Sequence, residues 1–272
     1  MTTGDLSETT KSTGALSDNR GVFPSRGRIR AEIAIVLGLS LGASAIYSVV
    51  AIVNRLTQTT ALSQQTATLN NSLSDRPTFD LIYQLLAIFF DLMPVALVLF
   101  LLWSTNRPHL QRFGIDSTRP RFDALGGVAI LLIIGLPGIG VYLGGRALGI
   151  SVNVVPTALD TWWWTIPVLL LSALRAGVTE EFIVVGYLFA RLSDLGWGRW
   201  QIIITSALVR GTYHLYQGFG GFIGNVAMGI FFGWLYTRYG RLVPLVVAHF
   251  LLDAVIFIGY PWAAETLPAL FG

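Results

Sequence analysis

Long apolar runs separated by shorter polar segments make up most of this chain. A helix needs about 20 mostly apolar residues to cross the hydrocarbon core of a bilayer. Seven segments approach or exceed this length: 31–53, 81–103, 124–145, 161–192, 200–216, 222–236 and 242–260. The pattern predicts an all-α fold, a polytopic bundle with seven or eight membrane helices.

The number of crossings depends on the segment 161–192, which is either one long helix or two pieces broken near Gly177. Arginines cluster before residue 31, between 107 and 121, and again around 191–199 and 238–241. Cytoplasmic loops carry an excess of Lys and Arg. If 161–192 crosses once, all these clusters lie on one side. We therefore expect seven crossings, a multi-pass plasma-membrane protein and a cytoplasmic N-terminus.

Four regions follow from the same pattern. Residues 1–30 are rich in Thr, Ser, Gly and Asp, which predicts a disordered cytoplasmic tail. Residues 31–160 should hold the N-terminal transmembrane helices and their loops, residues 161–260 a helical core, and residues 261–272 a C-terminal tail. A polar loop within 54–80 could contact a partner in a membrane protein complex.

Composition supports a membrane protein and excludes several other classes. Of the 272 residues, 53% are hydrophobic and only 12% are charged, whereas ordinary globular domains carry about 25% charged residues. The chain has no cysteine, which excludes disulfides, thiolate metal sites and a cysteine nucleophile. Short arginine clusters between apolar runs are typical of topology signals, so we expect the lipid bilayer and no nucleic acid as a partner.

Charged and histidine side chains occur inside the apolar runs of the C-terminal half. A charge at the centre of a membrane helix costs roughly 2.5–3.5 kcal/mol on insertion scales, so such residues need an internal partner or a function. They occur in the stretches "GVTEEFIVVGYLF", "RGTYH" and "HFLLD", as Glu180, Glu181, Arg210, His214, His249 and Asp253. Residues four apart share a helix face, so three helices should direct these groups toward one polar pocket.

Such a pocket could hydrolyse an amide in two ways. A carboxylate with a histidine can deprotonate water while a second histidine with a hydrogen-bonding neighbour stabilises an oxyanion. Alternatively, two histidines and carboxylates could bind zinc, which accepts imidazole and carboxylate ligands. No serine lies beside the histidines in a nucleophile-elbow pattern, so an acyl-enzyme route has no support.

The three stretches, in this order, resemble the motifs of the CPBP intramembrane proteases, which are written EExxxR, FxxxH and HxxxN. This family, also called Abi, includes the CAAX prenyl endopeptidases and the bacteriocin-processing or immunity proteins. The resemblance covers residues 173–258, about a third of the chain. It implies an endopeptidase that cleaves a membrane-embedded or lipid-linked peptide, with residues 161–260 as its CPBP-like catalytic core.

The resemblance also implies residue roles. Glu180 and His214 would activate the attacking water, and His249 with Asp253 would form the oxyanion side, with Glu181 as the second glutamate of the motif. The cofactor stays unknown. If a metal is used, zinc bound by Glu180, His214 and His249 is the expected form.

Three positions depart from the motifs: Val185 replaces the arginine, Arg210 the phenylalanine and Asp253 the asparagine. We hypothesise that the arginine has moved to the facing helix, where Arg210 pairs with Glu181. Arg175 is the rival partner, because a buried carboxylate needs a nearby cation.

The third departure affects the oxyanion side. An ionised aspartate accepts hydrogen bonds and cannot donate one, so Asp253 would instead orient His249 or bind a metal. The amide of Asn225, in the next apolar run, could supply the missing donor.

Two alternatives remain open at this point. The departures could mark a catalytically divergent branch that acts as a membrane scaffold or partner-binding subunit. A transporter that uses the polar cluster as an ion path is less expected, because the chain shows no inverted repeat or paired broken helices.

Overall fold

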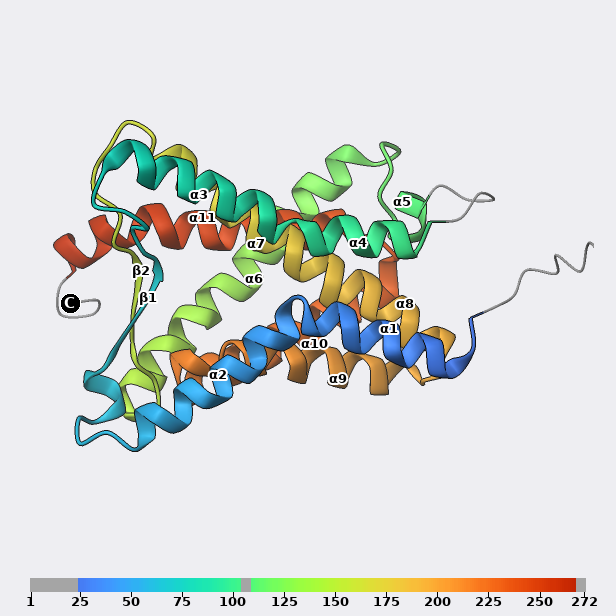
Figure 1. The fold of residues 1–272 in the computed structure, drawn as a ribbon, viewed down its shortest axis with the longest axis horizontal. Helices are drawn as coiled ribbons and strands as arrows, with labels where there is room; N and C mark the ends of the chain where they lie inside the picture. Colours follow the sequence, from blue (N-terminus) through green and yellow to red (C-terminus); the bar gives the residue numbers. More distant parts are fainter. Residues whose placement is uncertain (1–23, 104–108, 268–272) are drawn as a thin grey trace, which may run out of the picture.

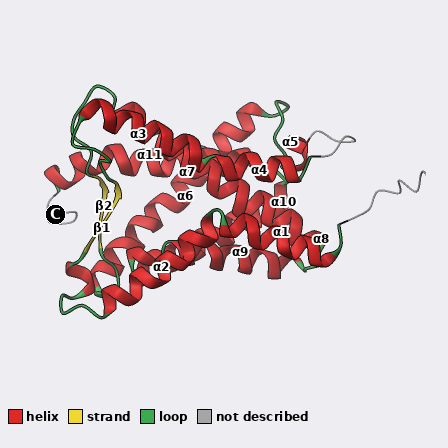
Figure 2. Ribbon diagram, in the orientation of Figure 1, coloured by secondary structure: helices red, strands yellow, loops and turns green. Residues whose placement is uncertain are grey.

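The computed structural model describes residues 24–103 and 109–267. Helices form most of this part of the chain (Figure 1; Figure 2). The first half contains α1 (Arg26–Gly38), α2 (Leu41–Leu56), the 3₁₀ turn η1 (Leu62–Gln64), β1 (Thr66–Asn70), α3 (Pro77–Asp91), α4 (Met93–Leu101), α5 (His109–Arg112) and α6 (Pro120–Ala147). The second half contains β2 (Asn153–Thr157), α7 (Thr165–Glu180), the π-helix η2 (Glu181–Tyr187), α8 (Leu188–Asp194), α9 (Arg199–Tyr213), the 3₁₀ turn η3 (Leu215–Gln217), α10 (Phe219–Tyr239) and α11 (Val243–Thr266).

The expected number of crossings is not confirmed. Within the described residues, four helical segments are long and apolar enough to cross a membrane: Pro77–Leu101, Pro120–Ala147, Phe219–Tyr239 and Val243–Thr266. The pair α1 and α2, bent by 58°, adds a fifth if it is counted as one span. A multi-pass helical membrane bundle therefore stands, but with four to five candidate spans rather than seven or eight.

The predicted span 31–53 is not one straight helix. The chain bends between Gly38 and Leu41, where the Ser40 hydroxyl donates to the Val36 carbonyl at 2.6 Å. A serine that bonds back to the carbonyl four residues earlier competes with the helical hydrogen bonds and favours a bend. The whole run 31–53 is apolar enough to be taken as one span, so its length and hydropathy did not locate the bend.

The segment around Gly177 does not break. Instead α7 continues into η2 and α8, with the irregularity placed at residues 181–187 as a π-helix. Gly177 has a packing role, since a Cβ there would lie 3.1 Å from the amide nitrogen of Phe250 on α11. In η2, the Ser206 hydroxyl of α9 donates to the Val184 carbonyl at 2.7 Å, which satisfies a backbone group beside the irregular turns.

Both predicted tails are shorter than expected. Helix α1 already begins at Arg26, where the hydroxyl of the N-cap residue Ser25 accepts a hydrogen bond from the Arg28 amide. Helix α11 extends through Pro261 to Thr266. The remaining tail residues, 1–23 and 268–272, lie outside the described residues, so disorder in the N-terminal tail stays a prediction.

The fold is mostly helical, which is consistent with the all-α prediction, and it contains in addition one small sheet that the sequence did not predict. Strands β1 and β2 form a two-stranded parallel sheet in which Thr66, Ala67, Thr68 and Asn70 pair with Asn153, Val154, Val155 and Thr157 respectively. β1 contains two threonines and β2 contains two valines and one threonine, and these β-branched residues favour extended structure. The sheet lies at one end of the bundle, where β1 connects α2 to α3 and β2 connects α6 to α7 (Figure 1, left).

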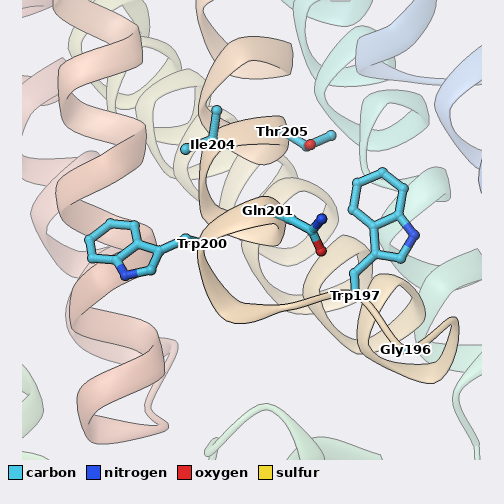
Figure 3. Close-up of a pocket in the computed structure, with 6 residues that line it drawn as sticks. All are labelled: Gly196, Trp197, Trp200, Gln201, Ile204 and Thr205. Carbon is cyan, nitrogen blue, oxygen red and sulfur yellow. The ribbon is translucent and has the colours of Figure 1, made fainter.

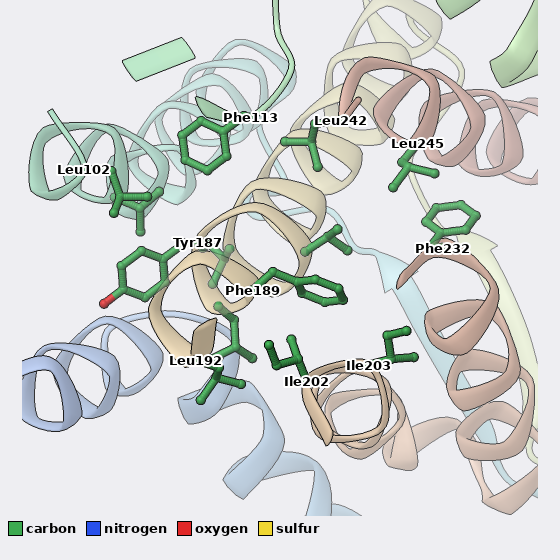
Figure 4. Packing of buried hydrophobic residues seen from close by; sticks show 14 of the residues in the cluster. Leu102, Phe113, Tyr187, Phe189, Leu192, Ile202, Ile203, Phe232, Leu242 and Leu245 are labelled. Atoms are coloured by element: carbon green, nitrogen blue, oxygen red, sulfur yellow. The ribbon is translucent and has the colours of Figure 1, made fainter. Parts of the chain in front are cut away.

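The main apolar core surrounds η2 and α8. Its buried side chains come from α4, α9, α10, α11 and the segment after α5, and include Leu102, Phe113, Tyr187, Ile203, Phe232 and Leu245 (Figure 4). Helix α11 packs against both α6 and α7, and α9 packs against α10. This packing fixes the junction of α7 and η2 between α9 and α11, which is where the charged motif residues lie.

Ion pairs tie the arginine-rich end of the bundle together. Arg191 of α8 binds Glu32 of α1 at 2.7 Å, and Arg241 binds Asp123 of α6 at 2.6 Å and Asp116 at 3.1 Å. The hydrogen bond from the Arg241 guanidinium holds the pKa of the Asp116 carboxyl well below its ordinary value. Two of the predicted arginine clusters thus also have structural partners.

Candidate active site

The structure brings the motif residues of three segments together. Glu180 and Glu181 lie at the junction of α7 and η2, Arg210 and His214 at the end of α9, and His249 and Asp253 one turn apart on α11. Just after His214 the chain turns through η3 to Gly218, whose φ of 96° favours glycine, and then enters α10. His214 therefore lies where α9 ends and the turn into α10 begins.

The buried ion pair between Arg210 and Glu181 is confirmed. Arg210 Nη2 lies 2.5 Å from Glu181 Oε1, and both side chains are completely buried. The same carboxylate oxygen lies 2.7 Å from Nδ1 of His249. The rival partner Arg175 instead binds Asp91 of α3 at 2.8 Å. Glu181 therefore joins α9 and α11 to η2 through one carboxylate.

Glu180 carries the neighbouring carboxylate and has a different set of contacts. The hydroxyl of Tyr213 donates to Glu180 Oε2 at 2.6 Å. Arg210 Nη1 lies 3.8 Å and His249 Nε2 lies 3.9 Å from the same oxygen. The Tyr213 hydrogen bond holds this carboxylate in place, while the guanidinium and the imidazole are farther away. The carboxylate can therefore still accept a hydrogen bond from a further donor.

Sequence reasoning missed Tyr213. The signal was present, because Tyr213 stands next to His214 in an apolar helix, and a buried tyrosine hydroxyl usually finds a hydrogen-bond partner. The identity of that partner depends on how α9 faces α7, which the spacing within one helix does not give.

The ring of His214 is oriented by its own helix. Its Nδ1 lies 3.1 Å from the Arg210 carbonyl oxygen. A carbonyl only accepts, so Nδ1 carries the hydrogen, and in the neutral ring Nε2 is left as the basic nitrogen. His214 is partly exposed and interacts electrostatically with Glu180. It can therefore exchange a proton with a group bound beside Glu180.

His249 and Asp253 form the other side of the cluster. Because Nδ1 of His249 donates to Glu181, its Nε2 faces Asp253 Oδ2 at 3.7 Å and Glu180 Oε2 at 3.9 Å. Those separations are too long for direct hydrogen bonds. The imidazole thus lies between carboxylates, and its outer nitrogen is available to a bound group. Asp253 is the more exposed of the two, with 22% of its side chain accessible.

Asn225 lacks the contact expected of an oxyanion donor. Its side-chain amide donates to the Gly221 carbonyl of its own helix at 3.0 Å. Among the interactions of the described residues, Asn225 has none with the charged cluster. The role proposed for it stays a prediction without support from its contacts.

The side chains do not form a ready zinc site. In the described ranges, no group of three or more histidine, aspartate or glutamate side chains is arranged to hold a metal ion. Among the residues expected to bind zinc, Nε2 of His249 and the nearer oxygen of Glu180 are 3.9 Å apart, and Nδ1 of His249 is engaged by Glu181. We therefore derive no catalytic step through zinc.

A surface pocket at the α8–α9 turn is separate from this cluster. Its lining residues are Gly196, Trp197, Trp200, Gln201, Ile204 and Thr205, and the two indole rings point in different directions (Figure 3). None of these side chains is an acid or a histidine, so this pocket carries none of the groups needed for hydrolysis.

Comparison with known proteins gives one match. Residues 162–255 match a family model described as type II CAAX prenyl endopeptidase Rce1-like. This segment contains all three motifs, and the match confirms the resemblance to the CPBP intramembrane proteases for this part of the chain. Neither the curated proteins nor the solved structures gave a match.

Proposed function

We propose that this protein is an intramembrane endopeptidase, of the kind that the CAAX endopeptidase match to its C-terminal half describes. Its substrate would be a membrane-associated peptide that is prenylated, lipid-linked or embedded in the bilayer. The observation that carries the proposal is the position of Glu180, which lies between the hydroxyl of Tyr213 and the imidazoles of His214 and His249.

The proposed reaction begins with a water molecule bound to Glu180 and to Nε2 of His214. Its proton passes to one of these two bases while its oxygen attacks the carbonyl carbon of the scissile bond. The tetrahedral intermediate then collapses, the C–N bond breaks, and the same proton passes to the leaving amine nitrogen. The products are a carboxylic acid and an amine.

The oxyanion would be stabilised from the α11 side. A protonated His249 has a hydrogen on Nε2 that can be donated to the oxyanion, while its other hydrogen stays bound to Glu181. An ionised Asp253 cannot donate, so its role is to orient and balance the charge of His249. In this assignment Asp253 has a role as an aspartate, so the asparagine of the motif is not required at this position.

Glu180→Gln is the variant that tests the proposal. The protein is reconstituted in liposomes with an internally quenched peptide that ends in a farnesylated CAAX-type sequence. We expect cleavage by the wild type and a loss of at least about 100-fold in kcat in the variant, because a general base contributes roughly that much. Glu265→Gln makes the same chemical change at an exposed position near the end of α11, and should leave the rate unchanged.

The result separates the two functional classes. No cleavage by correctly folded wild-type protein would favour the divergent scaffold or partner-binding subunit. Cleavage at equal rates by the two variants would instead show that Glu180 is not the general base. The cellular setting that we propose is the plasma membrane with a cytoplasmic N-terminus, on the basis of the arginine clusters.

A further inference from the structure

The two outer edges of the small sheet differ in their hydrogen-bonding capacity. On β2, the Val154 amide donates to the Tyr142 hydroxyl at 3.3 Å. Pro156 has no amide hydrogen, and its carbonyl accepts from the side chain of Asn70 at 2.7 Å. Proline and occupied backbone groups are ways in which proteins prevent an edge strand from pairing further. The β2 edge is therefore closed.

The edge of β1 is open at Thr68. The Asn153 amide donates to the Gln65 carbonyl at 2.8 Å, and the register pairs Thr66 with Asn153. In a parallel ladder with this register, Ala67 bonds to β2, whereas the backbone groups of Thr66 and Thr68 point away from it. Arg55 binds the Thr66 carbonyl at 3.1 Å.

The outward groups of Thr68 are largely unused. Its carbonyl has a contact of 3.5 Å with the Asn71 side-chain amide, which is at the limit of a hydrogen bond. Among the described residues, no side chain and no loop carbonyl accepts a hydrogen bond from its amide. One residue of an added antiparallel strand could bond both the amide and the carbonyl of Thr68, because a hydrogen-bonded pair of opposed residues exchanges two hydrogen bonds.

The end of β1 opens onto a cavity of about 190 Å³ between this strand, α3 and α7. Its lining includes Leu69, Asn71, Gln84, Asp91, Ser172 and Arg175. The walls are thus mixed in character, with an apolar side chain of Leu69 at the strand and an ion pair between Arg175 and Asp91 on the helices. A cavity of this kind suits a short piece of peptide with polar backbone and apolar side chains.

This cavity lies beside the helices that carry the candidate active site. Arg175 is five residues before Glu180 on α7 and interacts electrostatically with Asp253. Leu69 of β1 packs against a cluster that includes Ala173 of α7 and Ala254 of α11. The strand end therefore lies against the same two helices that carry Glu180 and Asp253.

We infer that the outer edge of β1 and the adjoining cavity bind an extended segment of the peptide substrate by strand addition, and lead it toward Glu180. The inference rests on the proposed function and adds the way in which the substrate is held. A helical segment keeps its backbone groups bonded internally, so an open strand edge selects an unwound peptide. Thr68 supplies the central pair of hydrogen bonds.

Thr68→Pro removes the outward amide hydrogen and leaves the ladder with β2 intact, because proline is tolerated where the amide faces away from the sheet. Thr68→Ala keeps the hydrogen and removes only the side chain. With the farnesylated CAAX-type peptide, we expect Thr68→Pro to raise KM about 10-fold, as expected for one lost hydrogen bond, with little change in kcat. Thr68→Ala should resemble the wild type.

Cross-linking tests the geometry without relying on turnover. The chain has no cysteine, so the double variant Thr68→Cys, Glu180→Gln has a single thiol. It is incubated with a series of the farnesylated CAAX-type peptides, each of which carries one free cysteine at a different position. Opposed residues of adjacent strands have Cβ atoms roughly 5 Å apart, which permits a disulfide. Val155→Cys is the matched control, since it pairs with Thr68 on the same sheet face but would lie about 10 Å from the added strand.

We expect disulfides from Thr68→Cys at alternate peptide positions and none from Val155→Cys. Wild-type cleavage with no cross-link at Thr68, or with a cross-link at Val155 instead, would overturn strand addition at β1 and leave the proposed protease intact. Cross-linking at Thr68 without wild-type cleavage would keep the peptide-binding edge and overturn the protease. Absence of both would overturn both.

Discussion

Removal of one partner from the buried pair of Arg210 and Glu181 should strongly destabilise the fold. Both side chains have 0% exposure, and their nearest atoms are 2.5 Å apart. Removal of one member of a buried pair leaves the other charge without compensation and costs about 3–5 kcal/mol. We therefore expect Arg210→Met to lower the free energy of unfolding by about this amount.

A double-mutant cycle isolates the interaction between the two side chains. Glu181→Gln keeps an acceptor for His249, so the cycle with Arg210→Met mainly removes the charge pair. The double variant should be more stable than the sum of the single changes predicts, by about 2–3 kcal/mol, which is the upper range for residues in one network. Unfolding in mixed detergent and SDS micelles can be followed by the fluorescence of the 8 tryptophans.

The chain supplies a control pair of an arginine and a carboxylate that is more exposed. Arg175 and Asp91 are 2.8 Å apart, but 29% and 54% of their side chains are exposed. Exposed pairs of this kind contribute about 0–1 kcal/mol. A coupling energy for Arg210 and Glu181 that is no larger than that of Arg175 and Asp91 would refute the reasoning, because burial would then have no measurable effect.

Three further predictions concern the site and the arginine-rich end. Tyr213→Phe should lower kcat about 10-fold or more with KM little changed, because a hydrogen bond to the charged Glu180 contributes about 1.5–3 kcal/mol; unchanged kinetics would show that Tyr213 does not position Glu180. Protein purified without chelator should lack stoichiometric zinc by elemental analysis, and zinc near one per chain that is lost in His214→Ala would contradict this. Arg241 lowers the pKa of Asp116 in the folded protein. The wild type should therefore have a higher free energy of unfolding than Asp116→Asn at neutral pH, and this difference should shrink as the pH falls below about 4. A difference that does not change with pH would argue against the pair.

The charged cluster was predictable because its parts are local. Arg210 and His214, like His249 and Asp253, are four residues apart on one helix, and this spacing fixes a shared face without knowledge of the fold. The choice of Arg210 over Arg175 as the partner of Glu181 came from the order of the motifs. Contacts that depend on the angle between helices, such as the one from Tyr213 to Glu180, were beyond this reasoning.

The sheet and the number of spans were not predictable for a different reason. Strands β1 and β2 have 5 residues each and lie in segments that read as loops between apolar runs. Their pairing depends on the helices between them bringing the two segments together. The bend between α1 and α2 likewise depends on a single serine hydrogen bond, which leaves the hydropathy of the run unchanged.

The π-helix η2 changes what the spacing of the first motif means in three dimensions. With hydrogen bonds between residues five apart, the residue at the bonded spacing from Glu181 is Gly186, where a Cβ would lie 2.6 Å from the ring of Phe113. Val185 is turned into the apolar core and is 1% exposed. An arginine introduced at 185 would therefore bury an unpaired charge rather than replace Arg210. In this chain, the π-helix therefore leaves position 185 to the apolar core and position 210 to the cation.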